Sequence, residues 1–259
     1  MKYLSKHLPA IFKKLRRAEA LVLLLDFDGT LAPLAATPSH AKLPKSSRLL
    51  LKKCSRVFPT VVVSGRALND VSKKIGIRGL IYGGNHGLEW YWKNKYGSVA
   101  ISPKIRRSLN FAKTKLKILP RFYRGVLLED KNLSLSLHYR GLAPSQVNTF
   151  KKSAGKVIES LDHKNLLMTK GKKVIEVRPR VSWHKGNFAK LVCAWLGRWY
   201  KQNFLPIYLG DDLTDEDAFK VLQSGLTIKV GPSRSSYAQY YVNDYQQAII
   251  FIRRLLKIV

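Results

Sequence analysis

Acidic residues are scarce in this sequence. Its 259 residues include 16 Asp and Glu against 47 Lys and Arg, which gives a formal net charge of +31. A charge of this size attracts anions, so nucleic acid, an anionic membrane surface and a phosphorylated substrate are all compatible with it. The basic residues are spread along the whole chain, and we interpret most of them as a solvated surface.

Cysteine and long hydrophobic runs are also lacking. The two cysteines, Cys54 and Cys193, lie far apart without a CxxC or Cys/His metal spacing, and we interpret both as core residues of a cytoplasmic protein. The apolar run 21–25 is too short for a signal peptide or a membrane span. For the basic segment 1–20, we keep only a weak contact with an anionic surface as an alternative.

Three short apolar runs are typical of central strands in a parallel sheet, and each ends in a polar loop. The runs are 21–25, 60–63 and 205–209, and the loops begin at Asp26, Ser64 and Gly210. Helical patterns at 67–75 and 215–223 follow two of these loops. In parallel α/β sheets, functional residues gather at the carboxyl ends of the strands. We therefore expect the three loops to form one site.

The pattern changes between Ser102 and Arg180. The segments 133–139 and 173–177 alternate apolar and polar residues, as half-exposed antiparallel strands do. Helical patterns at 103–119 and 144–160 separate them. The sequence thus predicts an α/β protein with a catalytic core at 1–102 and 181–259 and an inserted α+β domain at 103–180.

Seven of the 16 acidic residues occupy two short runs that follow predicted strands: Asp26 and Asp28, then Asp211, Asp212, Asp215, Glu216 and Asp217. Clustered carboxylates repel one another unless a hard cation such as Mg²⁺ lies between them. Asp28 and Asp215 could instead only cap helices or make turns. Two acidic runs at equivalent strand ends favour a metal site, and Mg²⁺ commonly leaves coordination positions for a substrate phosphate.

These residues suggest phosphoryl transfer. We expect Asp26 to be a nucleophile that forms an acyl phosphate, and Asp28 to protonate the leaving oxygen and later accept a proton from water. Ser64 offers a hydroxyl and a backbone N–H to the phosphoryl oxygens, and Lys185 offers a cation. On its own, Lys185 could equally be a surface residue.

With these motifs assembled, the chain resembles the haloacid dehalogenase (HAD) superfamily. Asp26-Phe27-Asp28-Gly29-Thr30-Leu31 matches the first motif, and Ser64, Lys185 and Gly210-Asp211-Asp212 match the second, third and fourth in order. This resemblance implies a Rossmann-like HAD core with a parallel sheet. It also implies an inserted α+β cap of the C2B type between the second and third motifs.

A closer resemblance is to trehalose-6-phosphate phosphatases. Their characteristic segments correspond here to 63–66 (VSGR), 84–89 (GNHGLE), 129–131 (EDK), 137–140 (LHYR), 174–179 (VIEVRP) and 210–217 (GDDLTDED). The resemblance implies a Mg²⁺-dependent hydrolase of trehalose 6-phosphate in trehalose biosynthesis, acting through an aspartyl phosphate. We expect a cytoplasmic monomer that binds this small sugar phosphate and no specific nucleic acid.

The resemblance also implies roles for individual residues. Asp26, the Asp28 carbonyl and Asp211 would hold Mg²⁺, with Asp212 and Asp215 in support. Ser64 and Lys185 would bind the phosphate. The sugar would be bound by core residues Gly65, Arg66, Asn85 and His86 and by cap residues Glu129, Lys131 and Glu176. Charged and bidentate partners discriminate well among sugar hydroxyls. Without the resemblance, Glu129 and Glu176 would be interpreted as surface acids paired with lysines.

Two other functions are considered. The first is the same chemistry on another sugar or polyol phosphate, which would keep the core motifs and change the cap contacts. The second is a basic protein that binds nucleic acid or an anionic surface on a HAD fold. The complete catalytic set argues against the second function. The aromatic residues Trp90, Tyr91 and Trp92 beside Lys93 are interpreted as packing at the edge of the core.

Overall fold

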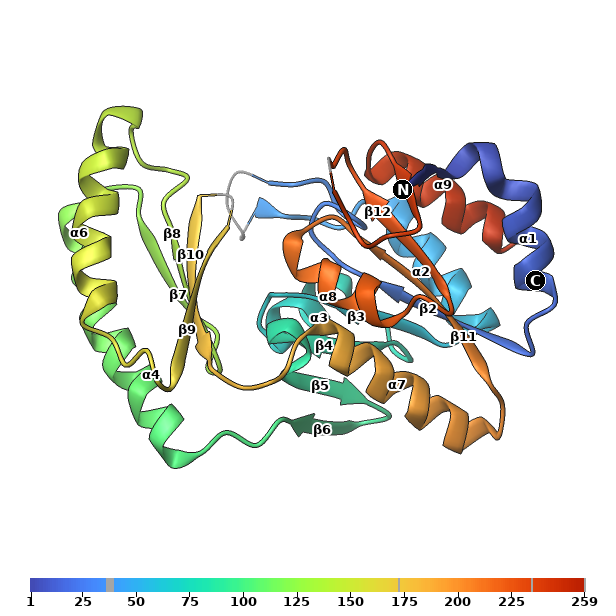
Figure 1. Ribbon diagram of the computed structural model, residues 1–259, viewed down its shortest axis with the longest axis horizontal. Helices are drawn as coiled ribbons and strands as arrows, with labels where there is room; N and C mark the ends of the chain where they lie inside the picture. The colour runs from blue at the N-terminus through green and yellow to red at the C-terminus, as the bar shows by residue number, and fades with distance from the viewer. Residues whose placement is uncertain (36–39, 172, 234, 259) are drawn as a thin grey trace. The chain divides into compact units, whose positions relative to one another are not determined.

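The computed structural model describes residues 1–35, 40–171, 173–233 and 235–258 (Figure 1). The chain divides into two compact units. The larger unit comprises Met1–Leu34, Ala41–Ser98 and Trp183–Val259, and the smaller unit comprises Ala35–His40 and Val99–Ser182.

The larger unit is built on a sheet whose middle strand, β2, carries the apolar run near the start of the chain. The strand order is β1-β13-β12-β11-β2-β3-β4-β5-β6. Neighbouring strands from β1 to β4 in this order are parallel, whereas β5 and β6 are antiparallel. The predicted α/β class with a parallel sheet is therefore confirmed. The bounds are β1 (Lys2–Tyr3), β2 (Ala20–Leu25), β3 (Thr60–Val63), β4 (Ile81–Gly84), β5 (Glu89–Trp92), β6 (Lys95–Ser98), β11 (Phe204–Gly210), β12 (Leu226–Val230) and β13 (Tyr240–Val242).

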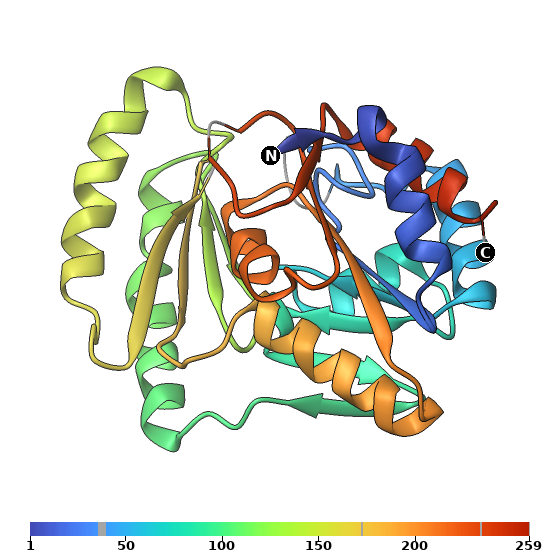
Figure 2. The same cartoon turned by 45° about the vertical axis from the view of Figure 1, so that its right-hand side comes forward.

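Helices cover this sheet, and the strand residues between them are buried. The helices of the larger unit are α1 (Leu8–Arg16), α2 (Lys45–Val57), α3 (Leu68–Ile75), α7 (Lys185–Tyr200), α8 (Leu213–Val221) and α9 (Tyr245–Leu255), with short 3-10 helices η1 (Leu4–His7) and η3 (Asn85–Gly87). On one face, Phe188 of α7 and Phe219 of α8 pack in one core cluster with Val22, Leu24 and Tyr208 of the sheet. In Figure 2, α7 and α8 (orange) lie near each other, whereas α1 (blue) and α9 (red) lie apart from them.

The basic amino-terminal segment uses its apolar side chains inside the larger unit. Ile11 and Leu15 of α1 are buried, and the Phe12 ring stacks on Phe251 of α9 with 6.3 Å between ring centroids. The apolar face of α1 is therefore not available for a membrane contact. No helix in the described part of the chain has the length and apolar character needed to cross a membrane.

The tryptophans of β5 pack against α7, as the sequence indicated. Trp90 lies against Phe188 and Trp195, and Trp92 stacks on Trp195. These contacts join the antiparallel edge of the sheet to the helix that begins at Lys185.

The smaller unit is an antiparallel sheet with helices over one face. Its strands β7 (Leu127–Asp130), β8 (Leu135–His138), β9 (Leu166–Gly171) and β10 (Val174–Pro179) pair in the order β7-β8-β10-β9. Its helices are α4 (Pro103–Leu116), α5 (Leu119–Phe122), α6 (Val147–Glu159) and the 3-10 helix η4 (Pro144–Gln146). Leu135, Leu137 and Ile175 face Leu109 of α4 and Phe150 of α6 in a core of their own.

Candidate active site

Three strands of the larger unit deliver polar loops to the same edge of its sheet. Asp26 follows β2, Ser64 follows β3 and Asp211 follows β11, and both β3 and β11 pair directly with β2. The backbone N–H of Asp26 donates to the Leu209 carbonyl at 2.9 Å, so the ladder between β2 and β11 continues to the site. The parallel register therefore places the predicted loops next to one another.

A buried lysine lies among the acidic residues. Lys185, the first residue of α7, donates from its Nζ to Asp26 Oδ1 at 2.7 Å and to Asp215 Oδ1 at 2.8 Å. Its side chain is only 2% exposed. The alternative that Lys185 is a surface residue is therefore wrong.

Three carboxylates, from Asp26, Asp211 and Asp215, come together beside this lysine. One oxygen of each lies within 4.8 Å of the others. With all groups ionised, three negative charges face the single positive charge of Lys185, which leaves an excess of two negative charges. Oxygen ligands with this excess suit a hard divalent cation.

The environment shifts the pKa values of these groups. Burial raises the pKa of Asp26, and Lys185 opposes this effect while Asp215 and Asp211 add to it. Burial, together with the charge of Asp215, raises the pKa of Asp211 to about 7. Burial alone would lower the pKa of Lys185, but Asp215 and Asp26 together raise it well above its ordinary value. The lysine thus stays charged, while Asp26 and Asp211 hold protons more tightly than exposed acids do.

Asp28 is held by a different cation. Its two carboxylate oxygens accept hydrogen bonds from Arg66 Nε at 2.6 Å and Arg66 Nη2 at 2.7 Å. Arg66 Nη1 donates to Asp70 at 2.7 Å. The Asp28 side chain is 31% exposed, whereas that of Arg66 is 8% exposed. In this structure Arg66, which was predicted to contact sugar, therefore orients the predicted acid/base through a bidentate ion pair.

Gly29 allows the first loop to pass close to the fourth. Its φ is +81°, and a Cβ built on it would lie 2.1 Å from Asp211 Oδ2. A side chain at this position would therefore collide with the acidic cluster. The glycine next to Asp28 therefore has a steric cause.

The acidic loop after β11 is fixed by several contacts. Asp212 and Asp215 form a capping box at the start of α8, so the alternative role of Asp215 as a cap is real and coexists with its place in the cluster. The buried Tyr208 hydroxyl donates to Asp215 Oδ1 at 2.7 Å. Lys229 of β12 donates to the Asp211 carbonyl at 2.7 Å and lies 3.5 Å from Glu216.

The loop after β3 is buried and supported from β4. Ser64 is 1% exposed, and its Oγ accepts from the Arg66 N–H at 3.2 Å. A Cβ at Gly65 would lie 2.7 Å from the His86 ring, so this ring packs directly on the Gly65 backbone. The fully buried Asn85 donates from its side-chain amide to Glu89 at 2.7 Å. Glu89 also accepts from the Leu68 N–H at 2.8 Å, and this links the loop to α3.

In the smaller unit, the predicted sugar-binding residues gather on one face of the sheet. Glu129, Ser136 and Glu176 lie directly opposite one another on β7, β8 and β10. Glu176 accepts from Lys131 Nζ at 3.1 Å and from Ser136 Oγ at 3.2 Å. Glu129 pairs with His138 at 2.8 Å. The helices cover the other face, so these polar side chains lie opposite the apolar core.

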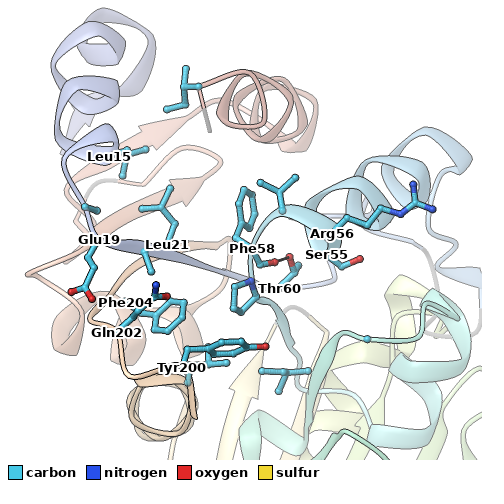
Figure 3. A pocket seen from close by; sticks show the side chains of 18 of the residues that line it. Leu15, Glu19, Leu21, Ser55, Arg56, Phe58, Thr60, Tyr200, Gln202 and Phe204 are labelled. Carbon is cyan, nitrogen blue, oxygen red and sulfur yellow. Dashed lines mark hydrogen bonds between the residues drawn. The ribbon is translucent and has the colours of Figure 1, made fainter. Parts of the chain in front are cut away.

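A cavity in the larger unit lies away from the acidic cluster of that unit. It has a volume of about 570 Å³, and Figure 3 shows Phe58, Tyr200 and Phe204 around it. Leu21 and Thr60, at the starts of β2 and β3, also line it. Because Asp26 follows the opposite end of β2, this cavity is distinct from the acidic cluster.

Four residues that organise the site were not predicted. Tyr208 and Asp70 show no distinctive sequence signal, since a tyrosine in an apolar strand or an acid in a helix is ordinary. Glu89 ends the characteristic segment 84–89, but this segment gave it no role. Lys229 does show one, because it is a charged residue inside the otherwise apolar run Leu226–Val230. A buried lysine needs an acceptor, and here the acidic loop supplies it.

Comparison with known proteins points to one family. The family model described as trehalose-phosphatase matches residues 24–246. A protein from Oryza sativa subsp. japonica, "Probable trehalose-phosphate phosphatase 4", is 31% identical over 252 residues, which cover 93% of this chain and 67% of the relative. "Trehalose-phosphate phosphatase B" of Arabidopsis thaliana is 29% identical over 259 residues, with 93% of this chain and 67% of the relative covered.

Solved structures share the fold. The C-terminal domain of Candida albicans trehalose-6-phosphate phosphatase has a TM-score of 0.84 at 23% identity, with 97% of each chain covered. A haloacid dehalogenase-like hydrolase from Bacteroides thetaiotaomicron has a TM-score of 0.63 at 13% identity, with 92% of this chain and all of the other covered. These likenesses confirm the Rossmann-like HAD fold.

The raised pKa of Asp211 predicts that stability depends on pH when divalent cations are removed. The folded protein keeps the Asp211 proton up to about pH 7, whereas an ordinary Asp releases it near 3.8. Because the folded state binds more protons in this interval, the free energy of unfolding falls as the pH rises from about 4 to about 7. In EDTA, we expect a lower melting temperature at about pH 8 than at about pH 5.5.

The Asp211→Asn variant tests this assignment. An amide has no proton to lose, so the variant should melt at a higher temperature than the parent protein at about pH 8 in EDTA, with a smaller difference between the two pH values. An unchanged pH dependence of the melting temperature would contradict the role given to Asp211.

Proposed function

Because the chain belongs to the trehalose-phosphatase family, we propose that it hydrolyses trehalose 6-phosphate to trehalose and phosphate. The observation that carries this proposal is the position of Asp26, buried between Lys185 and two further carboxylates at the end of the central strand. The larger unit is the catalytic core and the smaller unit is the cap. The reaction completes a trehalose-making pathway.

Asp26 is the nucleophile. Lys185 holds Oδ1, which leaves Oδ2 as the oxygen that attacks phosphorus. Attack forms an aspartyl phosphate and breaks the bond between phosphorus and the sugar oxygen. Lys185 favours the ionised, nucleophilic form of Asp26 against the effect of burial. The Ser64 hydroxyl and the Lys185 ammonium then bind the phosphoryl oxygens.

Asp28 is the acid and base of the two half-reactions. It gives a proton to the departing sugar oxygen, and it takes one from the water that hydrolyses the aspartyl phosphate. The bidentate contact with Arg66 fixes the orientation of the carboxyl group that acts in both half-reactions.

The acidic cluster fits Mg²⁺ through its hard oxygen donors and its excess of negative charge. Asp26, the Asp28 carbonyl and Asp211 are the proposed ligands, with Asp212 and Asp215 in support. When bound, Mg²⁺ neutralises charge on the phosphoryl oxygens. Lys229 and Tyr208 keep the ligand loop in place through the Asp211 carbonyl and the Asp215 carboxylate.

The hydroxyls of the sugar are bound by Glu129, Lys131 and Glu176 in the smaller unit and by Gly65, Arg66 and His86 in the larger, with the fully buried Asn85 in support. The support for the first three is their gathering on the helix-free face of the sheet. Their existing hydrogen bonds with Ser136 and His138 fix the carboxylate positions before substrate binds. Asn85 acts through the buried loop rather than by reaching out to the sugar.

The protein is proposed to act as a monomer in the cytoplasm. Cys54 and Cys193 are both free thiols, as expected in a reducing compartment. The net charge of +31 opposes association of two copies.

A substrate panel tests the proposed reaction. We expect Mg²⁺-dependent phosphate release from trehalose 6-phosphate well above release from glucose 6-phosphate and sucrose 6-phosphate. The Asp26→Asn variant should lose at least about a thousandfold in kcat, because an amide cannot form the acyl phosphate. Equal phosphate release from a comparator would contradict the proposed sugar specificity but not the proposed phosphatase mechanism. Full activity of Asp26→Asn would contradict the mechanism.

The positioning role of Tyr208 has a matched control within the chain. Tyr208→Phe removes the hydrogen bond to Asp215 and should lower Mg²⁺ affinity or kcat by about tenfold or more. Tyr82→Phe removes an equally buried hydroxyl, which donates to the Ile77 carbonyl at 2.7 Å. Both variants should lose about 1 kcal/mol of stability.

Only Tyr208→Phe should raise the Mg²⁺ concentration needed for half-maximal thermal stabilisation or lower kcat. Equal effects of the two variants on these quantities would show that Tyr208 acts only through stability.

A further inference from the structure

Three large apolar side chains form an exposed stripe in the smaller unit. Phe111 of α4 is 47% exposed, Ile118 between α4 and α5 is 46% exposed, and Phe122 of α5 is 72% exposed. Lys117 and Ile118 keep helical backbone angles, so the spacing i, i+7 and i+11 puts the three side chains on one side. The opposite side of α4, with Leu109, Ala112 and Leu116, packs into the core.

The chain segment that carries this stripe has only basic charges. Residues 103–124 contain no Asp or Glu and eight Lys and Arg: Lys104, Arg106, Arg107, Lys113, Lys115, Lys117, Arg121 and Arg124. Arg107, Lys115 and Arg121 are exposed beside the stripe, and the Lys115 ammonium lies 5.3 Å from the centre of the Phe111 ring. Lys113, in the last turn of α4, forms an ion pair with Asp130 at the end of β7.

Exposed Phe and Ile on a helical face flanked by Lys and Arg are the features of helices that lie in the membrane interface. The apolar side chains enter the acyl boundary, and the cations meet anionic headgroups. We infer that the stripe of Phe111, Ile118 and Phe122, with Arg107, Lys115 and Arg121, binds the surface of an anionic phospholipid membrane. This is peripheral binding by a face that no proposed catalytic or sugar-binding residue occupies.

Charge decides against a second copy of this chain as the occupant. Two such faces would bring their basic residues together, and the neighbouring acid of each copy, Asp130, is already paired with Lys113. Nucleic acid would pair with the cations and could stack on the two phenylalanines, but the aliphatic Ile118 between them offers no stacking surface. An anionic membrane can bury all three apolar side chains at its acyl boundary, and its headgroups can pair with the flanking cations.

The contribution of this surface has to be separated from the overall charge of the chain. We would measure sedimentation of the full-length protein with vesicles of about 30% phosphatidylserine in phosphatidylcholine, and with phosphatidylcholine alone. The triple variant Arg107→Gln, Lys115→Gln, Arg121→Gln should bind the anionic vesicles at least about tenfold more weakly. The matched control is Lys151→Gln, Lys152→Gln, Lys156→Gln on α6, which removes the same charge from three exposed positions.

The control variant should bind nearly as the parent protein does, and parent binding should weaken with salt. An equal loss in both triple variants would show that only net charge acts, and this would overturn the proposed surface. Absence of binding by the parent protein to anionic vesicles would overturn it as well.

The aromatic side chains separate a membrane from nucleic acid. Phe111→Gln, Phe122→Gln keeps the charge and should lower vesicle binding by about tenfold. Leu49→Gln, at a 63% exposed position on α2, should not lower it. Phosphatase activity and melting temperature serve as folding controls for every variant. Unchanged vesicle binding by the double variant, or tighter binding of the parent protein to single-stranded RNA than to the vesicles, would overturn the inference.

Discussion

The ion pairs of one buried lysine hold together side chains that would otherwise repel one another. Lys185 bridges Asp26 and Asp215 with contacts of 2.7 and 2.8 Å, and Asp211 completes the cluster. These groups arise from three distant parts of the chain, and only the parallel sheet brings them together. Two negative charges remain in excess, so the arrangement can accept a divalent cation without losing the lysine. Burial, together with the neighbouring negative charges, raises the pKa values of Asp26 and Asp211.

Much of this arrangement could be predicted from sequence because apolar runs and the polar residues after them are local signals. The runs at 21–25, 60–63 and 205–209 are β2, β3 and β11, and the predicted helices at 103–119 and 144–160 correspond to α4 and α6. In contrast, β7 and β9 lack clear alternation, since their sequences are LLED and LLMTKG, and their strands depend on pairing with β8 and β10. These two segments form strands because of their tertiary contacts and not because of their local sequence.

The partners of the site residues could not be predicted from their spacing. Arg66 was expected to contact sugar, and the structure adds that its guanidinium pairs with Asp28 and Asp70. Asp215 was expected to support the site, and it proved to be one of the three clustered carboxylates as well as a helix cap. The contact between Arg66 and Asp28 and the carboxylate cluster both depend on distances between residues far apart in sequence. The net charge of +31 did not indicate which basic residues form a binding surface. The stripe at Phe111 and Phe122 was recognised only from the exposed fractions of these side chains in the structure.

The central claim is that Asp26 carries the phosphoryl group during turnover. The most direct measurement is a rapid acid quench during turnover of trehalose 6-phosphate whose phosphate group is radioactively labelled. Peptide mapping of the labelled protein then locates the phosphate. An acyl phosphate survives acid and is released by hydroxylamine, so the account predicts such a label on the peptide that contains Asp26. A label on another residue, or full turnover without any labelled protein, would contradict it.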